Sequence, residues 1–117
     1  VREPVEKIIS NINNIHLIDP IDYLSFIKLM DACYLILTDS GGIQEETTFL
    51  KIPCLTLRPN TERPITCSMG TNTLIDFNID KILNYVEQIE MGTYKKGTIP
   101  QLWDGKATER ILRIISV

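Results

Sequence analysis

The sequence has 117 residues, with 12 basic and 15 acidic side chains and a formal net charge of −3. This length suits one domain, and basic residues that form no stripe argue against a nucleic-acid partner. The longest nearly uncharged apolar run, Ala32–Thr38, is far too short for a membrane span, and the first residues lack the apolar core of a signal peptide, so we expect a cytoplasmic protein. The three cysteines show no C-x-x-C spacing and there is a single histidine, so we expect no disulfide framework, metal or cofactor.

Short apolar runs alternate with helical patterns along the whole chain, which predicts a βαβ series with a parallel sheet. The expected helices cover Pro4–Ile12, Asp22–Met30 with Asp22 as its cap, Ile43–Leu50, a short segment starting at Arg63-Pro64, Asp80–Glu90 and Thr108–Val117. The expected strands cover Ile15–Ile18, Cys33–Thr38, Cys54–Leu57 and Thr73–Ile75. The pattern therefore predicts one α/β domain over residues 1–117, half of a doubly wound parallel sheet, whose ligand crevice lies outside the strand carboxyl ends.

The strand Cys33–Thr38 runs into the turn Asp39–Gly42, which precedes a helix. Gly41 and Gly42 allow a ligand to approach the backbone closely, and the free amides at the start of the helix favour an anion such as phosphate. Ser40 adds a hydroxyl donor. The full glycine-rich fingerprints of nucleotide sites are missing, so a tight turn capped by Asp39 or Ser40 stays an equal alternative.

Two further groups of charged residues could face the same edge of the sheet. Glu45 and Glu46 are helix neighbours about 100° apart, so they do not form a shared acid–base pair. One of them could accept hydrogen bonds from ribose hydroxyls, or both could simply stabilise the amino end of the helix. Arg58 and Arg63 follow the next strand and suit an anion contact, although Glu62 could hold one of them and a solvated loop is the plain alternative.

The run Leu37–Glu46, followed by Pro53 and Thr61–Pro64, closely resembles the non-hydrolysing UDP-N-acetylglucosamine 2-epimerases. The similarity extends to Asp22–Phe26 and Asp104–Ala107, so it covers nearly the whole chain. The resemblance implies a Rossmann-like half-domain of a glycosyltransferase-B-like fold. It also implies that the chain corresponds to the carboxyl-terminal part of the second domain of a two-domain enzyme.

The resemblance further implies substrate-binding roles for seven residues. They are Ser40, Gly41 and Gly42 for the diphosphate, Glu46 for the ribose hydroxyls, Phe26 and Ile21 beside the uracil, and Arg63 elsewhere in the nucleotide site. Ile21 stands where some members have Gln, so any contact there would use its backbone. The sequence departs from the family at Ile65, which replaces a Glu, and at Gln101–Trp103, where a Pro-Tyr-Gly approach is more usual.

As the resemblance has it, the reaction inverts carbon 2 of the sugar by eliminating UDP to a glycal and adding it back. The family's proposed catalytic acids lie in its amino-terminal domain, and its active-site His lies upstream in the second domain, so none of them matches this chain. We therefore expect the UDP-binding portion of a cytoplasmic, homodimeric 2-epimerase that serves surface polysaccharide synthesis, with no catalytic residue and no activity in the isolated chain.

Two alternatives come from other functional classes. The chain could be a stand-alone module that binds UDP-sugars, or regulates through them, without turnover. It could also belong to a glycosyltransferase of similar fold, which the run Thr61–Pro64 disfavours. The length of the complete reading frame would distinguish the first alternative from an epimerase, because the enzyme needs a second domain.

Overall fold

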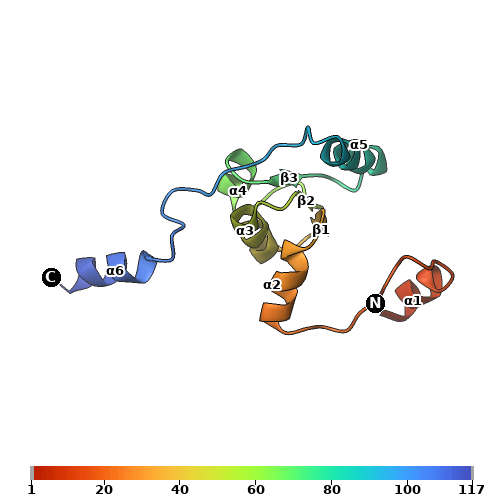
Figure 1. Ribbon diagram of the computed structural model, residues 1–117, viewed down its shortest axis with the longest axis horizontal. Helices are drawn as coiled ribbons and strands as arrows, with labels where there is room; N and C mark the ends of the chain where they lie inside the picture. The colour runs from red at the N-terminus through yellow and green to blue at the C-terminus, as the bar shows by residue number, and fades with distance from the viewer. Residues whose placement is uncertain (1, 117) are drawn as a thin grey trace.

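The computed structural model describes residues 2–116 as an α/β fold around a small parallel sheet (Figure 1). In chain order the elements are α1 (Arg2–Ile9), α2 (Tyr23–Asp31), β1 (Ile36–Thr38), α3 (Gly41–Leu50), β2 (Cys54–Thr56), α4 (Pro64–Ser68), β3 (Asn72–Leu74), α5 (Ile79–Glu90) and α6 (Ala107–Ile115). The fold class expected from the alternating pattern is therefore confirmed.

The sheet has the order β1-β2-β3, with both pairs parallel. The register places Ile36 beside Cys54 and Cys54 beside Asn72, so all three strands end together at Thr38, Thr56 and Leu74. The helix α3 connects β1 to β2, and α4 connects β2 to β3. The loops that follow β1 and β2 consequently meet at one edge of the sheet, where ligands of parallel α/β folds are usually bound.

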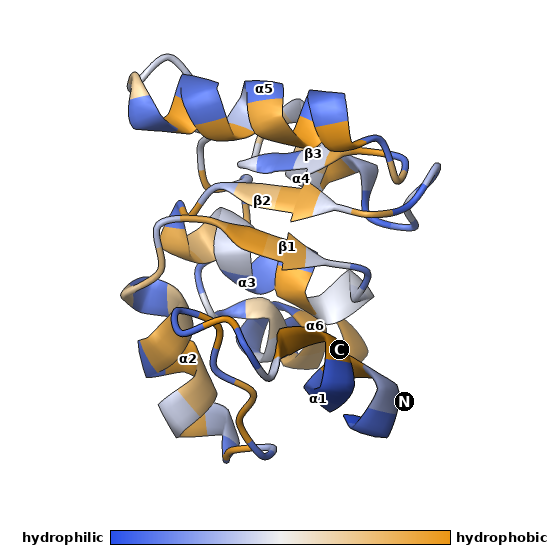
Figure 2. Cartoon of the chain, turned by 90° about the vertical axis from the view of Figure 1, so that its right-hand side faces the viewer, coloured by the Kyte–Doolittle hydropathy of each residue, from blue (hydrophilic) through white to orange (hydrophobic). Residues whose placement is uncertain are grey.

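The two faces of β2 differ in chemistry because successive side chains of a strand point to opposite sides. Leu55 packs with Ile75, Ile89 and Tyr94 in an apolar cluster, to which α5 contributes Ile82 and Tyr85 as well. Figure 2 shows the apolar stripe of α5 turned toward the sheet. This apolar cluster fixes the β3–α5 side of the domain.

The opposite face of the sheet is buried but mostly polar. Its fully buried polar side chains come from α3, α4 and the strands or their starts: Gln44, Thr47, Thr48, Thr56, Thr66, Thr71 and Asn72. Each of these side chains makes at least one hydrogen bond inside the protein. These hydrogen bonds are required, because a buried polar group without a partner lowers the free energy of unfolding by about 1–3 kcal/mol.

The prediction of a strand over Ile15–Ile18 is wrong. This segment has no strand pairing in the described part of the chain, and its apolar side chains are exposed, Ile18 to 56%. A strand needs a neighbouring strand to pair with, and the β1 edge is not met by this segment. The sheet therefore has three strands among residues 2–116 rather than the four expected.

The helix predictions are largely confirmed, with shifted ends. Asp22 caps α2 as expected, since its carboxylate accepts a hydrogen bond from the Ser25 amide at 3.0 Å, and α4 begins at Pro64. The helix α1 ends at Ile9, three residues before the predicted Ile12. The predicted end of the last helix, Val117, lies outside the described residues.

The chain is elongated because α1 and α6 stand away from the sheet at opposite ends (Figure 1). Its radius of gyration is 17.0 Å, whereas a compact domain of this length would have about 13 Å. Neither helix contains a buried residue, and the apolar side chains of α6 are open to solvent, Ile114 to 75%. The packed part of the domain thus runs from α2 to the segment after α5.

Tyr94 is expected to make this packed part less stable at alkaline pH. Its hydroxyl donates a hydrogen bond to the Thr71 carbonyl at 2.6 Å, and burial raises the pKa of Tyr94 from 10.0 to about 12. Between these values the unfolded chain loses the phenolic proton while the folded chain keeps it, so we expect the free energy of unfolding to fall by up to about 2–3 kcal/mol as pH rises from 10.0 to about 12.

Urea unfolding at about pH 9 and about pH 11 would measure about half of this loss, roughly 1–1.5 kcal/mol. The variant Tyr94→Phe is the control, because it keeps the ring packed against Tyr85 and removes the titrating group. An equal drop in both proteins would show that Tyr94 is not the source.

Candidate functional site

The candidate site begins where β1 enters α3. Ser40 is the N-cap of α3 in an extended conformation, and its side chain makes no capping hydrogen bond. The turn expected over Asp39–Gly42 is shorter than predicted, because Gly41 and Gly42 already belong to the first turn of the helix. Glycine is a poor helix former, which is why the sequence pattern placed the start of the helix at Ile43. The first two residues of α3 therefore present backbone without side chains.

The two glycines have different surroundings. A methyl group at Gly41 would lie 2.5 Å from Arg63 Nη1 and 3.1 Å from Arg63 Cζ, so the guanidinium lies directly over this backbone. A methyl group at Gly42 would meet no atom within 4 Å. Gly41 thus accommodates an arginine of the protein itself, whereas Gly42 leaves the helix backbone open to a ligand.

Arg63 reaches this position from the loop after β2, where it precedes α4 as its N-cap. Its Nε lies 3.1 Å from Glu45 Oε2, and its Nη1 lies 3.6 Å from Glu62 Oε2. The Nε atom is buried and has no partner in hydrogen-bond geometry, so its contact with Glu45 is an ion pair without a directed hydrogen bond. Such a loosely paired guanidinium keeps hydrogen-bonding capacity for an anion.

The structure also separates the two loop arginines. Arg58 donates two hydrogen bonds to Glu62, at 2.8 and 3.3 Å, and the same contact holds the pKa of the Glu62 carboxyl below its usual range. Glu62 is therefore mainly the partner of Arg58, one of the alternatives left open by the sequence. Arg63, in contrast, points to the first turn of α3.

Glu45 and Glu46 diverge as their helical spacing predicts. Glu45 faces Arg63, while the Glu46 carboxylate lies near the Tyr23 hydroxyl and raises the pKa of Tyr23. Glu46 thus lies between α2 and α3, one turn beyond Gly42. It borders a groove of about 430 Å³ that is lined by Tyr23, Leu24, Ile27, Glu45, Glu46, Phe49 and Leu50.

Phe26 and Ile21, the two residues expected beside the uracil ring, differ in their surroundings. Phe26 is half-buried in α2 and borders a hollow of about 280 Å³ together with Leu37 and Ile43, next to the first turn of α3. Ile21 precedes the N-cap of α2, and its side chain is 43% exposed. The structure therefore gathers Ser40, Gly41, Gly42 and Arg63 closely, sets Phe26 and Glu46 along the side of α3 that faces α2, and leaves Ile21 at the margin.

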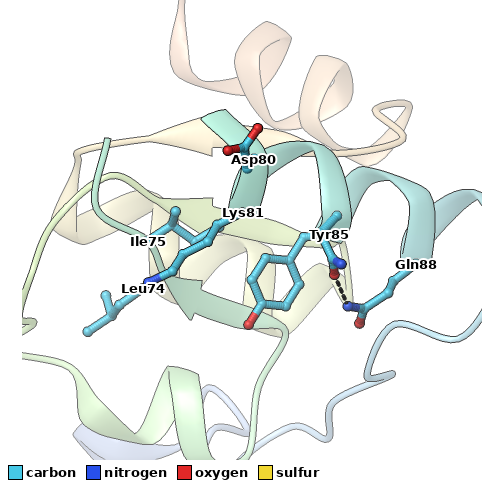
Figure 3. Close-up of a pocket in the computed structure, with 7 residues that line it drawn as sticks. Leu74, Ile75, Asp80, Lys81, Tyr85 and Gln88 are labelled. Atoms are coloured by element: carbon cyan, nitrogen blue, oxygen red, sulfur yellow. Dashed lines mark hydrogen bonds between the residues drawn. The ribbon is translucent and has the colours of Figure 1, made fainter. Parts of the chain in front are cut away.

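A separate pocket of about 390 Å³ lies at the end of β3, between the sheet and α5 (Figure 3). In Figure 3, Lys81 extends toward Leu74, and Gln88 donates a hydrogen bond of 2.6 Å to Asn84. None of the seven residues expected in the site lines this pocket. It is therefore distinct from the candidate site at the ends of β1 and β2.

Sequence reasoning missed three buried or half-buried residues beside the site: Gln44, Thr61 and Asn72. They come from three different elements or loops and are joined by side-chain hydrogen bonds of 2.6 and 3.0 Å. The only local signal was a glutamine on the inward face of an expected helix, where an apolar residue is usual. No local pattern could have shown that the three residues meet.

Comparisons with known proteins place these features in a family. A family model described as UDP-N-acetylglucosamine 2-epimerase matches residues 1–116. A UDP-N-acetylglucosamine 2-epimerase of Yersinia pestis is 46% identical over 119 residues, which covers 98% of this chain and 32% of the relative.

No helix among residues 2–116 has the length and hydropathy of a membrane span.

Two solved structures agree with the described fold. The Neisseria meningitidis enzyme bound to UDP-GlcNAc matches with a TM-score of 0.84 and 38% identity, covering 99% of this chain and 32% of that one. The Methanocaldococcus jannaschii enzyme in complex with UDP-GlcNAc and UDP matches with a TM-score of 0.82 and 41% identity, covering 98% and 31%. The chain thus spans about a third of the length of these relatives. Over that third, in sequence and in fold alike, the chain belongs to the UDP-N-acetylglucosamine 2-epimerase family.

Proposed function

We propose that this chain is the UDP-binding portion of an enzyme that interconverts UDP-N-acetylglucosamine and UDP-N-acetylmannosamine. The observation that carries the proposal is the position of the Arg63 guanidinium over Gly41, at the first turn of α3. A guanidinium and the free amides of a helix start together favour a diphosphate. Relatives that match this chain in fold are described as bound to UDP-GlcNAc or UDP.

The proposal assigns each site residue a binding task. Ser40, Gly41 and Gly42 hold the diphosphate through backbone amides and the Ser40 hydroxyl, and Arg63 neutralises its charge. Glu46 accepts hydrogen bonds from the ribose hydroxyls, a role acidic residues play in dinucleotide folds. Phe26 and the Ile21 backbone lie beside the uracil. The work of these groups is to retain UDP while it is separated from the sugar.

The acid–base steps belong, in this proposal, to parts of a longer enzyme outside the matched third. We therefore infer a two-domain protein in which residues 1–117 form one α/β unit, and a homodimer as its assembled state. A cytoplasmic location and a role in surface polysaccharide synthesis complete the proposal. They follow from the family resemblance and from a nucleotide-sugar substrate.

The test is calorimetric titration of the chain with UDP and with uridine. We expect UDP to bind more tightly, because only UDP carries the phosphates that meet α3 and Arg63. Equal affinity for UDP and uridine, or binding of neither, would contradict the proposal. Titration with inorganic pyrophosphate would show whether the phosphate part of the site acts without the nucleoside.

Glu46 and Glu45 should respond differently to loss of their charge. We expect Glu46→Gln to weaken UDP binding by about 1–3 kcal/mol, the range of hydrogen bonds to a charged group, and to reduce discrimination against 2′-deoxy-UDP. Glu45→Gln is the matched control, because Glu45 faces Arg63 rather than the groove beside Tyr23. The ratio of UDP to 2′-deoxy-UDP affinity should stay at the parent value in Glu45→Gln. The reverse pattern would show that Glu45 holds the ribose.

A further inference from the structure

Gln44 is the centre of a closed hydrogen-bond ring beneath the site. It is fully buried on α3, one turn after Ser40, and its Nε2 donates to the Ser40 carbonyl at 3.2 Å. Its Oε1 accepts from Thr61 Oγ1 at 2.6 Å and from Asn72 Nδ2 at 3.0 Å. The opposite amide orientation would set the Gln44 NH2 group against the Asn72 Nδ2 donor and the Gln44 oxygen against the Ser40 carbonyl, so these two contacts fix how the amide is turned.

The two branches of the ring end on the backbone of one residue, Arg63. Thr61 Oγ1, which donates to Gln44, accepts from the Arg63 amide at 3.0 Å. Asn72 Nδ2 donates to Thr66 Oγ1 at 3.0 Å, and Thr66 Oγ1 in turn donates to the Arg63 carbonyl at 2.7 Å. The amide and the carbonyl of Arg63 are therefore both held by groups that lead back to Gln44.

The ring is anchored to the sheet as well. Asn72 is fully buried at the start of β3, and its Oδ1 accepts from Thr56 Oγ1 on β2 at 2.6 Å. The anchored amide ring thus ties the start of α3 at Ser40, the end of β2, the start of β3 and both sides of Arg63 into one unit. Buried polar networks that are fully satisfied rigidify their surroundings, because every partner has a single favourable geometry.

We propose that Gln44, Asn72, Thr61 and Thr66 are positioning residues for the diphosphate site, which set where the Arg63 guanidinium stands relative to the amides of Gly41 and Gly42. This inference rests on the proposed function, since it names how that site is prepared for a diphosphate. A flexible arginine would lose conformational entropy on binding an anion, whereas a backbone fixed on both sides of Arg63 reduces that loss. The ring contacts the phosphate nowhere; it acts through Arg63.

The decisive test compares Thr61→Val with Thr61→Ser in the 117-residue chain. Thr61→Val removes the hydroxyl that links Gln44 to the Arg63 amide, so we expect UDP affinity to fall roughly tenfold while uridine affinity stays unchanged. Thr61→Ser keeps the hydroxyl and should restore UDP affinity to the parent value. Hydrogen exchange at the Arg63 amide should be faster in Thr61→Val than in Thr61→Ser, with or without UDP.

A second pair controls for general destabilisation. Thr66 and Thr48 are both fully buried, and each donates to a backbone carbonyl, to that of Arg63 at 2.7 Å and to that of Gln44 at 2.8 Å. We expect both Thr66→Val and Thr48→Val to lower the melting temperature, but only Thr66→Val to lower the ratio of UDP to uridine affinity.

The outcomes separate the two proposals. If the parent chain prefers UDP and both Thr61→Val and Thr66→Val keep that preference in full, the positioning role is wrong while the proposed function stands. If Thr48→Val lowers the preference as much as Thr66→Val, the ring acts only through stability, and the positioning role is again wrong. A parent chain without any preference for UDP overturns the proposed function and the positioning role together.

Discussion

Replacing Gly42 with valine is expected to abolish most of the preference of the chain for UDP over uridine. A Cβ atom at Gly42 would meet no atom within 4 Å, so we expect valine to fit there, and its branched side chain would cover the amides of the first turn of α3. Losing one or two hydrogen bonds to a charged phosphate corresponds to a roughly ten- to hundredfold loss of UDP affinity. Calorimetric titrations of the parent and Gly42→Val with both ligands would measure it.

Two alanine variants serve as controls for this result. Gly42→Ala adds only one methyl group in open space, so it should raise the stability of α3 by about 0.5–1 kcal/mol and weaken UDP binding less than valine does. Gly41→Ala would instead push the Arg63 guanidinium aside, because the methyl group would lie 2.5 Å from Nη1. If Gly42→Val is folded and its ratio of UDP to uridine affinity equals that of the parent, the phosphate does not lie over Gly42.

The 117-residue chain alone is expected to give no detectable epimerisation of UDP-N-acetylglucosamine. General acid–base catalysis requires a group within hydrogen-bond reach of the proton it transfers, and backbone amides cannot replace it. Beside the site, Glu45 is paired with Arg63, and Glu46 lies beside Tyr23 in the groove between α2 and α3. His16, the single histidine of the sequence, lies in the exposed segment before α2.

Proton NMR of the sugar region would detect a new C2 epimer at a level well below one turnover per chain. A full-length family member in the same buffer provides the positive control. Epimer formation that scales with the concentration of the chain and is lost in Arg63→Ala would show that these 117 residues carry acid–base groups of their own. Such a result would refute the proposal that this chain binds UDP while other parts of a longer enzyme carry out the acid–base steps.

Local signals in the sequence were enough to predict most of the helices. The capping carboxylate of Asp22 and the proline at the start of α4 act on their own backbone, so their effects can be predicted without the rest of the fold. The same holds for the divergence of Glu45 and Glu46, which follows from the helical repeat alone.

Pairing across the chain could not be predicted in this way. The apolar residues of Ile15–Ile18 fit a strand, but whether a strand forms depends on a partner that local sequence does not specify. The contact between Arg63 and Gly41 and the bond between Gln44 and Asn72 join residues 22 and 28 positions apart. Family resemblance supplied the expected binding role of Arg63, whereas only the three-dimensional structure shows the polar ring below it.

The end helices α1 and α6 divide the chain into regions of unequal cooperativity. Because neither contains a buried residue, little free energy of tertiary packing is lost when either helix unwinds. Their amides should then open and close independently of the global unfolding transition, as isolated helices of eight and nine residues do in water. The proposed nucleotide site, in contrast, is built on α3 and the strand ends, so we expect it to belong to the slowest-opening unit. Substitutions in α1 or α6 should therefore change the helical content of the chain and leave the arrangement of Arg63 over the start of α3 unchanged.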